Sequence, residues 1–320
     1  MMLGVIDVGT NSIHLLVGIL GLNGRFHTVL KERDLTRLGE GGLTSGRLTQ
    51  AARRRAMQVL ARYAAALKRC HVEHVEAVAT SAVRSASNGA GFVRDVRRQL
   101  GIPLRVISGR TEARLIYLGV VQAHRFRGTT LIVTVGGGSA QVIIGDGLRM
   151  QYVTSVPLGG ARLAQRFIRH DPPEPDEVEA LRAHVRQVWR PVVQAVQRHP
   201  WQRAVGSSAT IAQVMAAASF DEDGPKISRW LKNHPLQVRQ GQLQHLLERL
   251  ECSSADVRIQ LPGVDPRRED LMLPTGIALL EWMQGCRIRT LRYAPGSLRE
   301  GLVMDYLIRH RQRRVLQFDH

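Results

Sequence analysis

The stretch that decides the fold is Asp7-Val-Gly-Thr-Asn-Ser12, and Thr134-Val-Gly-Gly-Gly-Ser-Ala-Gln141 repeats its chemistry in the middle of the chain. Each follows a short apolar run and contains glycine, which lets the backbone turn sharply and direct N–H groups at phosphate oxygens. Thr10 and Ser12 add hydroxyl donors to the first turn, and Thr134 and Ser139 add them to the second. The two turns together predict a two-sided phosphate clamp.

The flanks of the two turns differ in charge. The first turn opens with an acid, Asp7, whereas Thr134 and Gln141 flank the second. A carboxylate is a preferred ligand of Mg²⁺, and a hydroxyl or an amide is a poor substitute. The second turn therefore has no carboxylate with which to hold a metal ion.

The chain has 320 residues, 44% of them hydrophobic, which predicts a globular protein of two domains. Lys and Arg number 45 against 27 Asp and Glu, a formal charge of +18. This excess favours polyanionic partners. Aromatic residues make up only 5%, which does not suggest a stacking platform for single-stranded nucleic acid.

The cysteines and the N-terminal segment bear on the compartment. Cys70, Cys252 and Cys286 are odd in number and far apart, so neither a disulfide framework nor a zinc site is indicated. The first residues show neither a basic secretory n-region nor a long apolar run. We expect a soluble cytoplasmic protein that makes no contact with a membrane.

Apolar runs and helical spacing predict alternating strands and helices in the first 120 residues. Residues 3–6 and 13–20 are expected to form a buried hairpin with Asp7 at the end of the first strand. Further strands are predicted at 75–79 and 104–107, and helices at 49–69, 89–100 and 111–120.

The strand-turn-strand pattern begins again at residues 130–144, about 127 positions after its first occurrence. It suggests an internal repeat and places a domain boundary between residues 1–123 and 124–320, with the C-terminal helix expected to return to the first domain. A further turn, Val205-Gly-Ser-Ser-Ala-Thr210, joins an apolar strand to a helix. A helix is also predicted after the loop at 171–176.

Eight segments in the same order resemble the Ppx/GppA phosphatase family of exopolyphosphatases and guanosine pentaphosphate phosphohydrolases. They are 7–17, Arg37-Leu-Gly-Glu-Gly41, 79–84, 107–116, 135–139, Pro157-Leu-Gly-Gly-Ala-Arg162, 268–270 and Gly296-Ser-Leu-Arg-Glu-Gly301. The resemblance implies an α/β fold of two actin-like (ribonuclease H-like) domains facing each other across a phosphate-binding cleft. It also implies a short form without extra C-terminal domains, and a homodimer.

The resemblance implies catalytic roles for two acids. Glu112 matches the family's catalytic base, which would deprotonate the water that attacks a terminal phosphoryl group. Asp7 matches the first acid, which helps to hold magnesium or to orient water, so Mg²⁺ is expected on Asp7 and Glu112. Structural alternatives are helix-dipole complementation by Glu112 and an Asx-turn at Asp7.

The resemblance and the donor chemistry together define an expected phosphate-binding set. Arg84 matches a family arginine that faces the phosphates, and guanidinium can grip phosphate with two bonds. The full set is Thr10, Asn11, Ser12, Arg84, Gly136, Gly137, Gly138, Ser139, Gly206, Ser207 and Ser208. Tight packing is the alternative explanation for any single glycine turn.

The family's second loop carries two acids, and these fall on Thr134 and Gln141. If those acids hold the metal, its affinity should fall and much of the rate could be lost. Two compensations are open: positive charge could partly replace magnesium, or Asp7 and Glu112 could bind it together with substrate oxygens.

The sequence therefore leads to one hypothesis with stated rivals. The hypothesis is a hydrolase that releases terminal phosphate from inorganic polyphosphate, or from guanosine pentaphosphate, by water attack. The rivals are a polyphosphate or alarmone binder without catalysis, a nucleic-acid-binding protein, which is not favoured, and a sugar-kinase-like ATPase. Basic runs at 53–55 and 309–314 could extend a channel for a polyanion, although charge runs are more often solvated.

Overall fold

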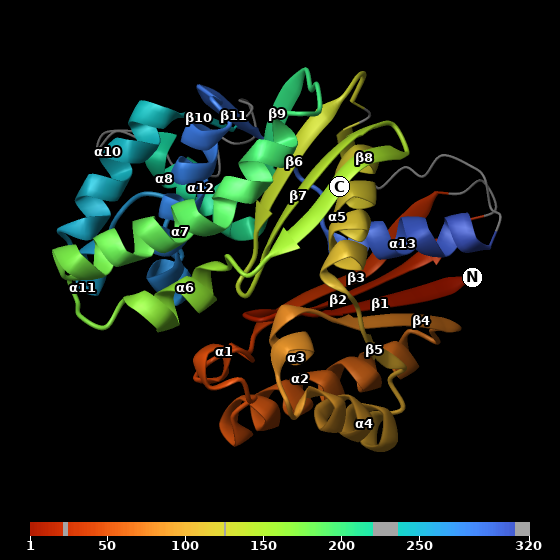
Figure 1. Ribbon diagram of the computed structural model, residues 1–320. Helices are drawn as coiled ribbons and strands as arrows, with labels where there is room; N and C mark the ends of the chain where they lie inside the picture. Colours follow the sequence, from red (N-terminus) through yellow and green to blue (C-terminus); the bar gives the residue numbers. More distant parts are fainter. Residues whose placement is uncertain (22–24, 125, 220–235, 311–320) are drawn as a thin grey trace. The chain divides into compact units, whose positions relative to one another are not determined.

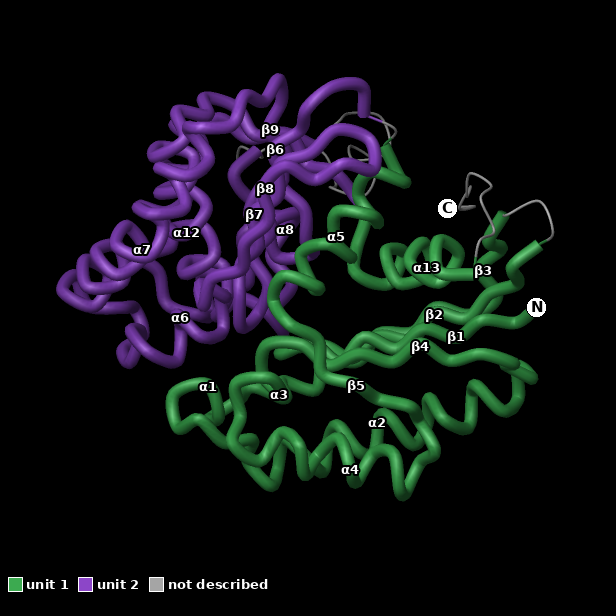
Figure 2. Tube along the Cα trace, turned by 45° about the vertical axis from the view of Figure 1, so that its right-hand side comes forward, with its two compact units in different colours: residues 1–125, 296–320 green, residues 126–295 purple. Residues whose placement is uncertain are grey.

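The computed structural model describes residues 1–21, 25–124, 126–219 and 236–310. The chain forms two compact units: Met1–Arg125 with Gly296–His320, and Phe126–Pro295 (Figure 2). Helix α13, near the C-terminus, therefore belongs to the same unit as the first strand. Within the described ranges, no helix combines the length and the apolar character needed to cross a membrane.

The first unit is built on a five-stranded sheet in the order β3-β2-β1-β4-β5. Strands β1 and β2, and β2 and β3, pair antiparallel, whereas β4 and β5 continue the sheet in parallel with β1. The strands are β1 Met2–Val8, β2 Ser12–Leu20, β3 Phe26–Leu35, β4 His74–Ala79 and β5 Leu104–Val106.

Helices cover both faces of this sheet (Figure 1). They are α1 Gly42–Ser45, α2 Gln50–Arg69, α3 Ser81–Ser85, α4 Gly89–Leu100, α5 Gly109–His124 and α13 Leu298–Arg309. Leu3, Val5 and Asp7 stand at every second position of β1, so their side chains lie on the same face of the sheet. Leu3 and Val5 pack in one core with residues of α5 and α13, so Asp7 points to the face that these helices cover.

Helix α13 can lie against α5 because a glycine stands at the contact. A Cβ on Gly301 would fall 1.8 Å from the carbonyl oxygen of Leu115, so a larger side chain does not fit there. Ion pairs hold α13 to its neighbours: Asp305 pairs with Arg114 of α5, and Arg309 pairs with Glu76 of β4 at 2.6 Å. The segment from Gly296 to Gly301 is thus a packing motif that brings Arg299 and Glu300 to the first unit.

The second unit repeats the strand order of the first. Its six-stranded sheet runs β10-β11-β9-β6-β7-β8. Read from the other edge, β8-β7-β6-β9-β11 corresponds to β3-β2-β1-β4-β5 of the first sheet, and β10 is added beyond β11. The strands are β6 Thr130–Val135, β7 Ala140–Asp146, β8 Arg149–Val156, β9 Arg203–Ser207, β10 Gln237–Arg239 and β11 Thr290–Tyr293. The α/β class with two actin-like units is confirmed, and the suggested internal repeat is present in the backbone.

The helices of the second unit surround a large apolar core. They are α6 Gly160–Phe167, α7 Pro175–Val196, α8 Ala209–Ser219, α10 Gln240–Glu251, α11 Ala255–Arg258, the 3₁₀ helix η1 Pro266–Leu271 and α12 Met272–Gly285. The rings of Trp189 and Trp282 lie 4.8 Å apart between centroids in this core, and the Trp189 indole N–H donates to the Ala278 carbonyl at 2.9 Å.

The elements predicted in the first 120 residues are confirmed with small shifts at their ends. The helix expected at 49–69 begins at Gln50, because the Thr49 hydroxyl accepts the Ala52 N–H at 3.2 Å and so caps it. Strand β3 was not predicted, since as an edge strand it carries many charged and exposed residues. The helix expected after the loop at 171–176 is α7, which begins at Pro175.

Candidate phosphate-binding and catalytic site

The first glycine turn joins β1 to β2, and backbone N–H groups of the same unit donate hydrogen bonds to its carbonyl groups. Gly9 N–H donates to the Ser12 carbonyl at 3.0 Å, and Gly39 N–H donates to the Thr10 carbonyl at 2.9 Å. Arg37 N–H donates to the Asn11 carbonyl at 2.9 Å. Within the described ranges, the N–H groups of Thr10 and Asn11 have no acceptor. The turn therefore offers donors, which is what a phosphate oxygen requires.

Asp7 is the last residue but one of β1 and lies opposite His14 of β2, its partner across the antiparallel pair. The Arg299 side chain approaches the same pair, with its Nη1 3.2 Å from His14 Nδ1. Burial raises the pKa of Asp7 to about 7, while Arg299 lowers it and the carboxylates of Glu112 and Glu300 raise it further. Asp7 thus titrates near neutral pH, where a group that accepts and returns a proton works best.

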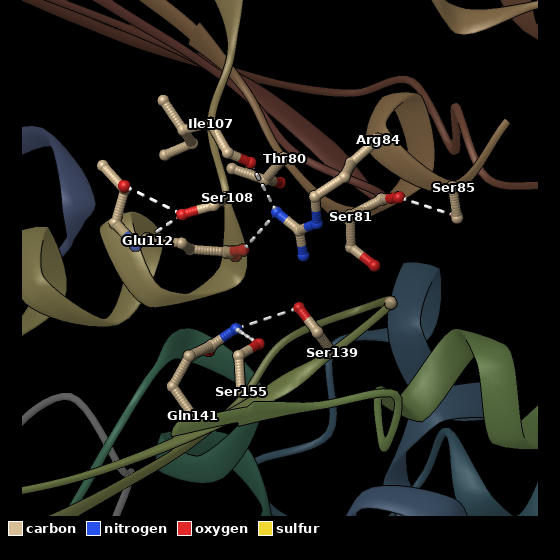
Figure 3. Close-up of polar contacts among 12 residues, drawn as sticks. Thr80, Ser81, Arg84, Ser85, Ile107, Ser108, Glu112, Ser139, Gln141 and Ser155 are labelled. Atoms are coloured by element: carbon tan, nitrogen blue, oxygen red, sulfur yellow. Dashed lines mark hydrogen bonds and ion pairs between the residues drawn. The ribbon is translucent and has the colours of Figure 1, made fainter. Parts of the chain in front are cut away.

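Glu112 lies in the first turn of α5 and is 8% exposed. Arg84, at the end of α3, donates from one nitrogen to the Glu112 carboxylate at 2.9 Å and to the Ile107 carbonyl at 3.0 Å (Figure 3). Ser108 helps to start α5, because its hydroxyl accepts the Thr111 N–H at 3.1 Å. The short helix α3, the first turn of α5 and the β5–α5 turn therefore fix the guanidinium and the carboxylate against each other.

Burial raises the pKa of Glu112, and the charge and hydrogen bond of Arg84 oppose that rise. A buried carboxylate with a raised pKa is a stronger base than one in water, and the arginine keeps it available in the ionised form. Asp7, Arg84 and Glu112 all belong to the first unit, as does the first glycine turn. Their geometry suits proton abstraction from a water molecule next to a bound phosphate.

The second glycine turn joins β6 to β7 and has the same internal bond as the first, from Gly136 N–H to the Ser139 carbonyl at 2.9 Å. The N–H groups of Gly160 and Arg162 bind the carbonyls of Gly136 at 2.9 Å and Gly137 at 3.0 Å. Arg162 Nε donates to the Gly138 carbonyl at 2.9 Å. All four carbonyls of the turn are therefore bound from inside the second unit.

Gly159 makes this support possible, because a Cβ there would lie 2.3 Å from the Gly138 nitrogen. Within the described ranges, the N–H groups of Gly137, Gly138 and Ser139 have no acceptor. The second turn is therefore a donor-lined loop of the same kind as the first.

Next to this turn, four polar residues form a row across neighbouring strands: Ser207 of β9, Thr134 of β6, Gln141 of β7 and Ser155 of β8. The Thr134 hydroxyl donates to the Gln141 carboxamide oxygen at 2.7 Å. The Gln141 amide nitrogen donates to the hydroxyls of Ser139 at 2.9 Å and Ser155 at 3.3 Å (Figure 3). Thr134 and Gln141, whose side chains carry no charge, are thus joined with Ser139 and Ser155 in one hydrogen-bonded network.

The residues predicted from the third turn lie at the end of β9 and the start of α8. Gly206 and Ser207 are part of the strand. The Ser208 hydroxyl donates to the Val135 carbonyl at 3.0 Å and accepts the Ile211 N–H at 3.1 Å, so it is occupied in starting α8. Phosphate binding by Gly206, Ser207 and Ser208 stays a prediction.

The donor set of the second loop does not fit a magnesium ion, because its side chains are hydroxyls and one amide that already bind each other. Among the described residues, no group of three or more histidine, cysteine or acidic side chains is placed to hold a metal. The first unit offers Asp7 and Glu112, and Glu112 is bound to Arg84. Magnesium on these two acids stays a prediction.

Several residues that shape the two turns were not predicted. Arg37 and Gly39 support the first turn, and Gly159 and Arg162 support the second. All four lie in segments that carry the family resemblance, which is the signal that could have found them. The hydrogen bond from Gln141 to Ser155 left no such signal, because the pairing depends on which strands are neighbours.

Two of the arginines in the basic run of helix α2 form ion pairs within the first unit. Arg53 pairs with Asp95 at 2.6 Å. Arg55 pairs with Glu40 at 2.5 Å and donates to the Thr36 carbonyl at 3.0 Å. These arginines tie α2 to its neighbours and are poorly suited to line a channel. Of the basic run at 309–314, residues 311–314 lie outside the described residues.

The chain was compared with known proteins. Residues 21–310 match the model of the Ppx/GppA phosphatase family. An exopolyphosphatase from Cytophaga hutchinsonii is 28% identical, with a TM-score of 0.85 over 96% of this chain and 98% of the relative. The Aquifex aeolicus member of the Ppx/GppA family is 26% identical, with a TM-score of 0.77 over 97% of this chain and 98% of the relative. With two α/β units, two donor-lined turns and a family match over most of its length, the chain belongs to the Ppx/GppA phosphatase family.

Proposed function

We propose that this protein is an exopolyphosphatase-type hydrolase that releases the terminal phosphate of inorganic polyphosphate by attack of water. The observation that carries the proposal is the buried Glu112 carboxylate held at 2.9 Å from Arg84 in the unit that also contains the first donor-lined turn. The match to the Ppx/GppA family supports a phosphatase-type reaction.

In the proposed reaction, the Glu112 carboxylate takes a proton from a water molecule as the water oxygen bonds to the terminal phosphorus. The anhydride bond on the other side of that phosphorus breaks, and the shortened chain leaves with the bonding electron pair. Arg84 balances charge at the phosphate and keeps Glu112 ionised, and the N–H groups of Thr10 and Asn11 hold phosphate oxygens. The proton on Glu112 then returns to solvent.

Three features favour polyphosphate as the substrate. The formal charge of +18 attracts a long polyanion. The chain carries two turns with the same donors, which suits a substrate made of repeated phosphate groups. The related protein from Cytophaga hutchinsonii is an exopolyphosphatase. Guanosine pentaphosphate offers the same terminal phosphoanhydride and is the alternative substrate.

One observation favours a second function, a polyphosphate or alarmone binder that does not hydrolyse its ligand. The second turn is backed by neutral side chains, because Thr134 and Gln141 bind each other at 2.7 Å. If turnover depends on acids at these two positions, the protein would retain binding and lose catalysis. It would then act as a sensor or carrier of the polyanion.

Phosphate release from long-chain polyphosphate separates the two functions. We expect release by the wild type, with and without added magnesium, and a loss of roughly a hundredfold or more in Glu112→Gln. Glu40→Gln is the matched control, since it removes another carboxylate that pairs with an arginine of the same unit. If the wild type binds polyphosphate but releases no phosphate, the protein is a polyphosphate binder and not a hydrolase.

A further inference from the structure

Gln141 is 2% exposed and lies behind the second glycine turn, where its carboxamide makes three hydrogen bonds. Its oxygen accepts from Thr134, and its nitrogen donates to Ser139 and Ser155. An amide nitrogen carries two hydrogens, so these two bonds use both of them. In this structure the carboxamide is oriented with its oxygen toward Thr134 and its nitrogen toward the two serines.

This direction decides what Ser139 can do. The Ser139 hydroxyl accepts from Gln141, so its own hydrogen points away from the amide. Ser139 is 4% exposed and makes no donor bond from its side chain within the described ranges. A carboxylate at position 141 would reverse the arrangement, because it can only accept and would draw that hydrogen to itself.

The backbone of the turn, like the Ser139 side chain, offers hydrogen-bond donors and no unbound carbonyl acceptor within the described ranges. The carbonyls of residues 136–139 are bound by Gly160 N–H, Arg162 and Gly136 N–H. The N–H groups of Gly137, Gly138 and Ser139 have no acceptor among the described residues. Donors without acceptors bind bare phosphate oxygens well. They supply neither an oxygen ligand for a magnesium ion nor an acceptor for the hydrogens of its bound waters.

The geometry points to a turn at residues 136–139 that selects metal-free phosphate groups, with Gln141 as the positioning residue that directs the Ser139 hydrogen toward the ligand. The choice of polyphosphate as the ligand rests on the proposed function, whereas the selection against magnesium rests on the donors of the second unit. Magnesium bound to the ligand is expected to compete with the turn and not to assist it.

The test is binding of fluorescently end-labelled polyphosphate, measured by anisotropy in EDTA and in magnesium at matched ionic strength. In wild type, magnesium should weaken binding. Gln141→Glu should weaken binding in EDTA by roughly tenfold or more, since one charge-assisted donor is lost and a buried negative charge is added. The double variant Thr134→Asp with Gln141→Glu should bind more tightly when magnesium is present.

Gln151→Glu is the control for charge. It adds the same carboxylate to an exposed position of β8 in the same sheet, so it shares any general effect of magnesium on a basic protein. Only the change at position 141 should alter the ratio of the affinities in magnesium and in EDTA. A ratio that is the same in both variants would overturn the assignment, and so would tighter wild-type binding in magnesium.

Ser139→Ala covers the case in which a buried carboxylate prevents folding. It removes the directed hydroxyl without adding charge, and it should weaken binding in EDTA by roughly tenfold. Unchanged binding would overturn the role of Ser139. Phosphate release, measured separately, distinguishes the two proposals: metal-free binding without release contradicts only the hydrolase, and magnesium-dependent binding with release contradicts only the selection. No binding in either buffer would contradict the selection.

Discussion

The two glycine turns have the same backbone hydrogen bond, but the side chains beside them differ in whether they can carry a charge. In each, a glycine N–H donates to the carbonyl of a serine three residues later, Gly9 to Ser12 and Gly136 to Ser139. Asp7 pairs with His14 across the first hairpin, and Thr134 pairs with Gln141 across the second. The first pair is ionisable and the second is neutral.

The Asp7–His14 pair and the Thr134–Gln141 pair also differ in the side chains that contact them. The neutral pair is satisfied by its own hydrogen bond and by two serines. The ionisable pair depends on Arg299, which helix α13 brings from the far end of the chain. A repeated backbone can therefore keep N–H donors in both halves while only one half carries an ionisable pair.

The strongest way to break the contrast is to place the neutral pair in the first unit, as Asp7→Thr with His14→Gln. We expect phosphate release to fall by roughly a hundredfold or more, because the ionisable group beside Glu112 is lost. Initial rates with saturating polyphosphate give the result. Since this pair is already stable in the second unit, the thermal unfolding of the variant serves as the folding control. Undiminished release would show that Asp7 has no part in the reaction.

Arg84→Lys tests whether the first unit needs geometry as well as charge. Arg84 donates to the Glu112 carboxylate and the Ile107 carbonyl from one nitrogen, so the other guanidinium nitrogens can donate to a phosphate. A lysine ammonium that makes the same two bonds has only one hydrogen left for a phosphate. We expect a loss of roughly ten- to a hundredfold in kcat/KM. Arg53→Lys is the control, because Arg53 also pairs with an acid of the same unit, Asp95. Equal effects at both positions would remove the special role of Arg84.

Asp7→Asn sharpens the contrast through stability. The pKa of Asp7 rises from 3.8 to about 7 because of burial, so the folded protein holds a proton that the unfolded chain releases. The stability due to that proton is fully present below about pH 4 and is lost as the pH rises to about 7. The asparagine side chain has no such proton to lose, so the variant should gain about 1–3 kcal/mol relative to wild type between pH 4 and pH 8.

Urea unfolding of the wild type and Asp7→Asn at several pH values measures this gain. The matched substitution Asp95→Asn, at a partly exposed carboxylate in the same unit, should show no comparable trend. A difference between wild type and Asp7→Asn that stays constant from pH 4 to pH 8 would mean that Asp7 ionises as it does in water.

Thr134→Val tests the neutral pair and should have the smallest effect. The change keeps the shape of the side chain but leaves the buried Gln141 oxygen without its donor at 2.7 Å. We expect a loss of about 1–2 kcal/mol in the free energy of unfolding, with little dependence on pH. Thr154→Val on β8 provides the comparison. A loss of unfolding free energy that depends on pH would show that an ionisable group is coupled to the pair of Thr134 and Gln141.

Much of the fold followed from local patterns. Apolar runs on both sides of each glycine turn predicted the strands that flank it, and their recurrence about 127 residues apart suggested an internal repeat. The strand orders of the two sheets agree with that repeat. Strand β3 was missed because it lies at an edge, where charged side chains hide the alternation. The basic run at 53–55 was considered as part of a channel for a polyanion, and Arg53 and Arg55 instead pair with acids that are 42 and 15 residues away in the sequence.

The sequence by itself determined the two glycine turns, the uncharged residues Thr134 and Gln141 beside the second, and the family. These depend on which residue stands at which position of a local motif. Only the tertiary structure decided that Arg84 holds Glu112, that Arg299 approaches His14 next to Asp7, and that Gln141 directs Ser139. Burial and the direction of a hydrogen bond arise when distant segments pack together, so the chemical character of each turn is set by its neighbours in space.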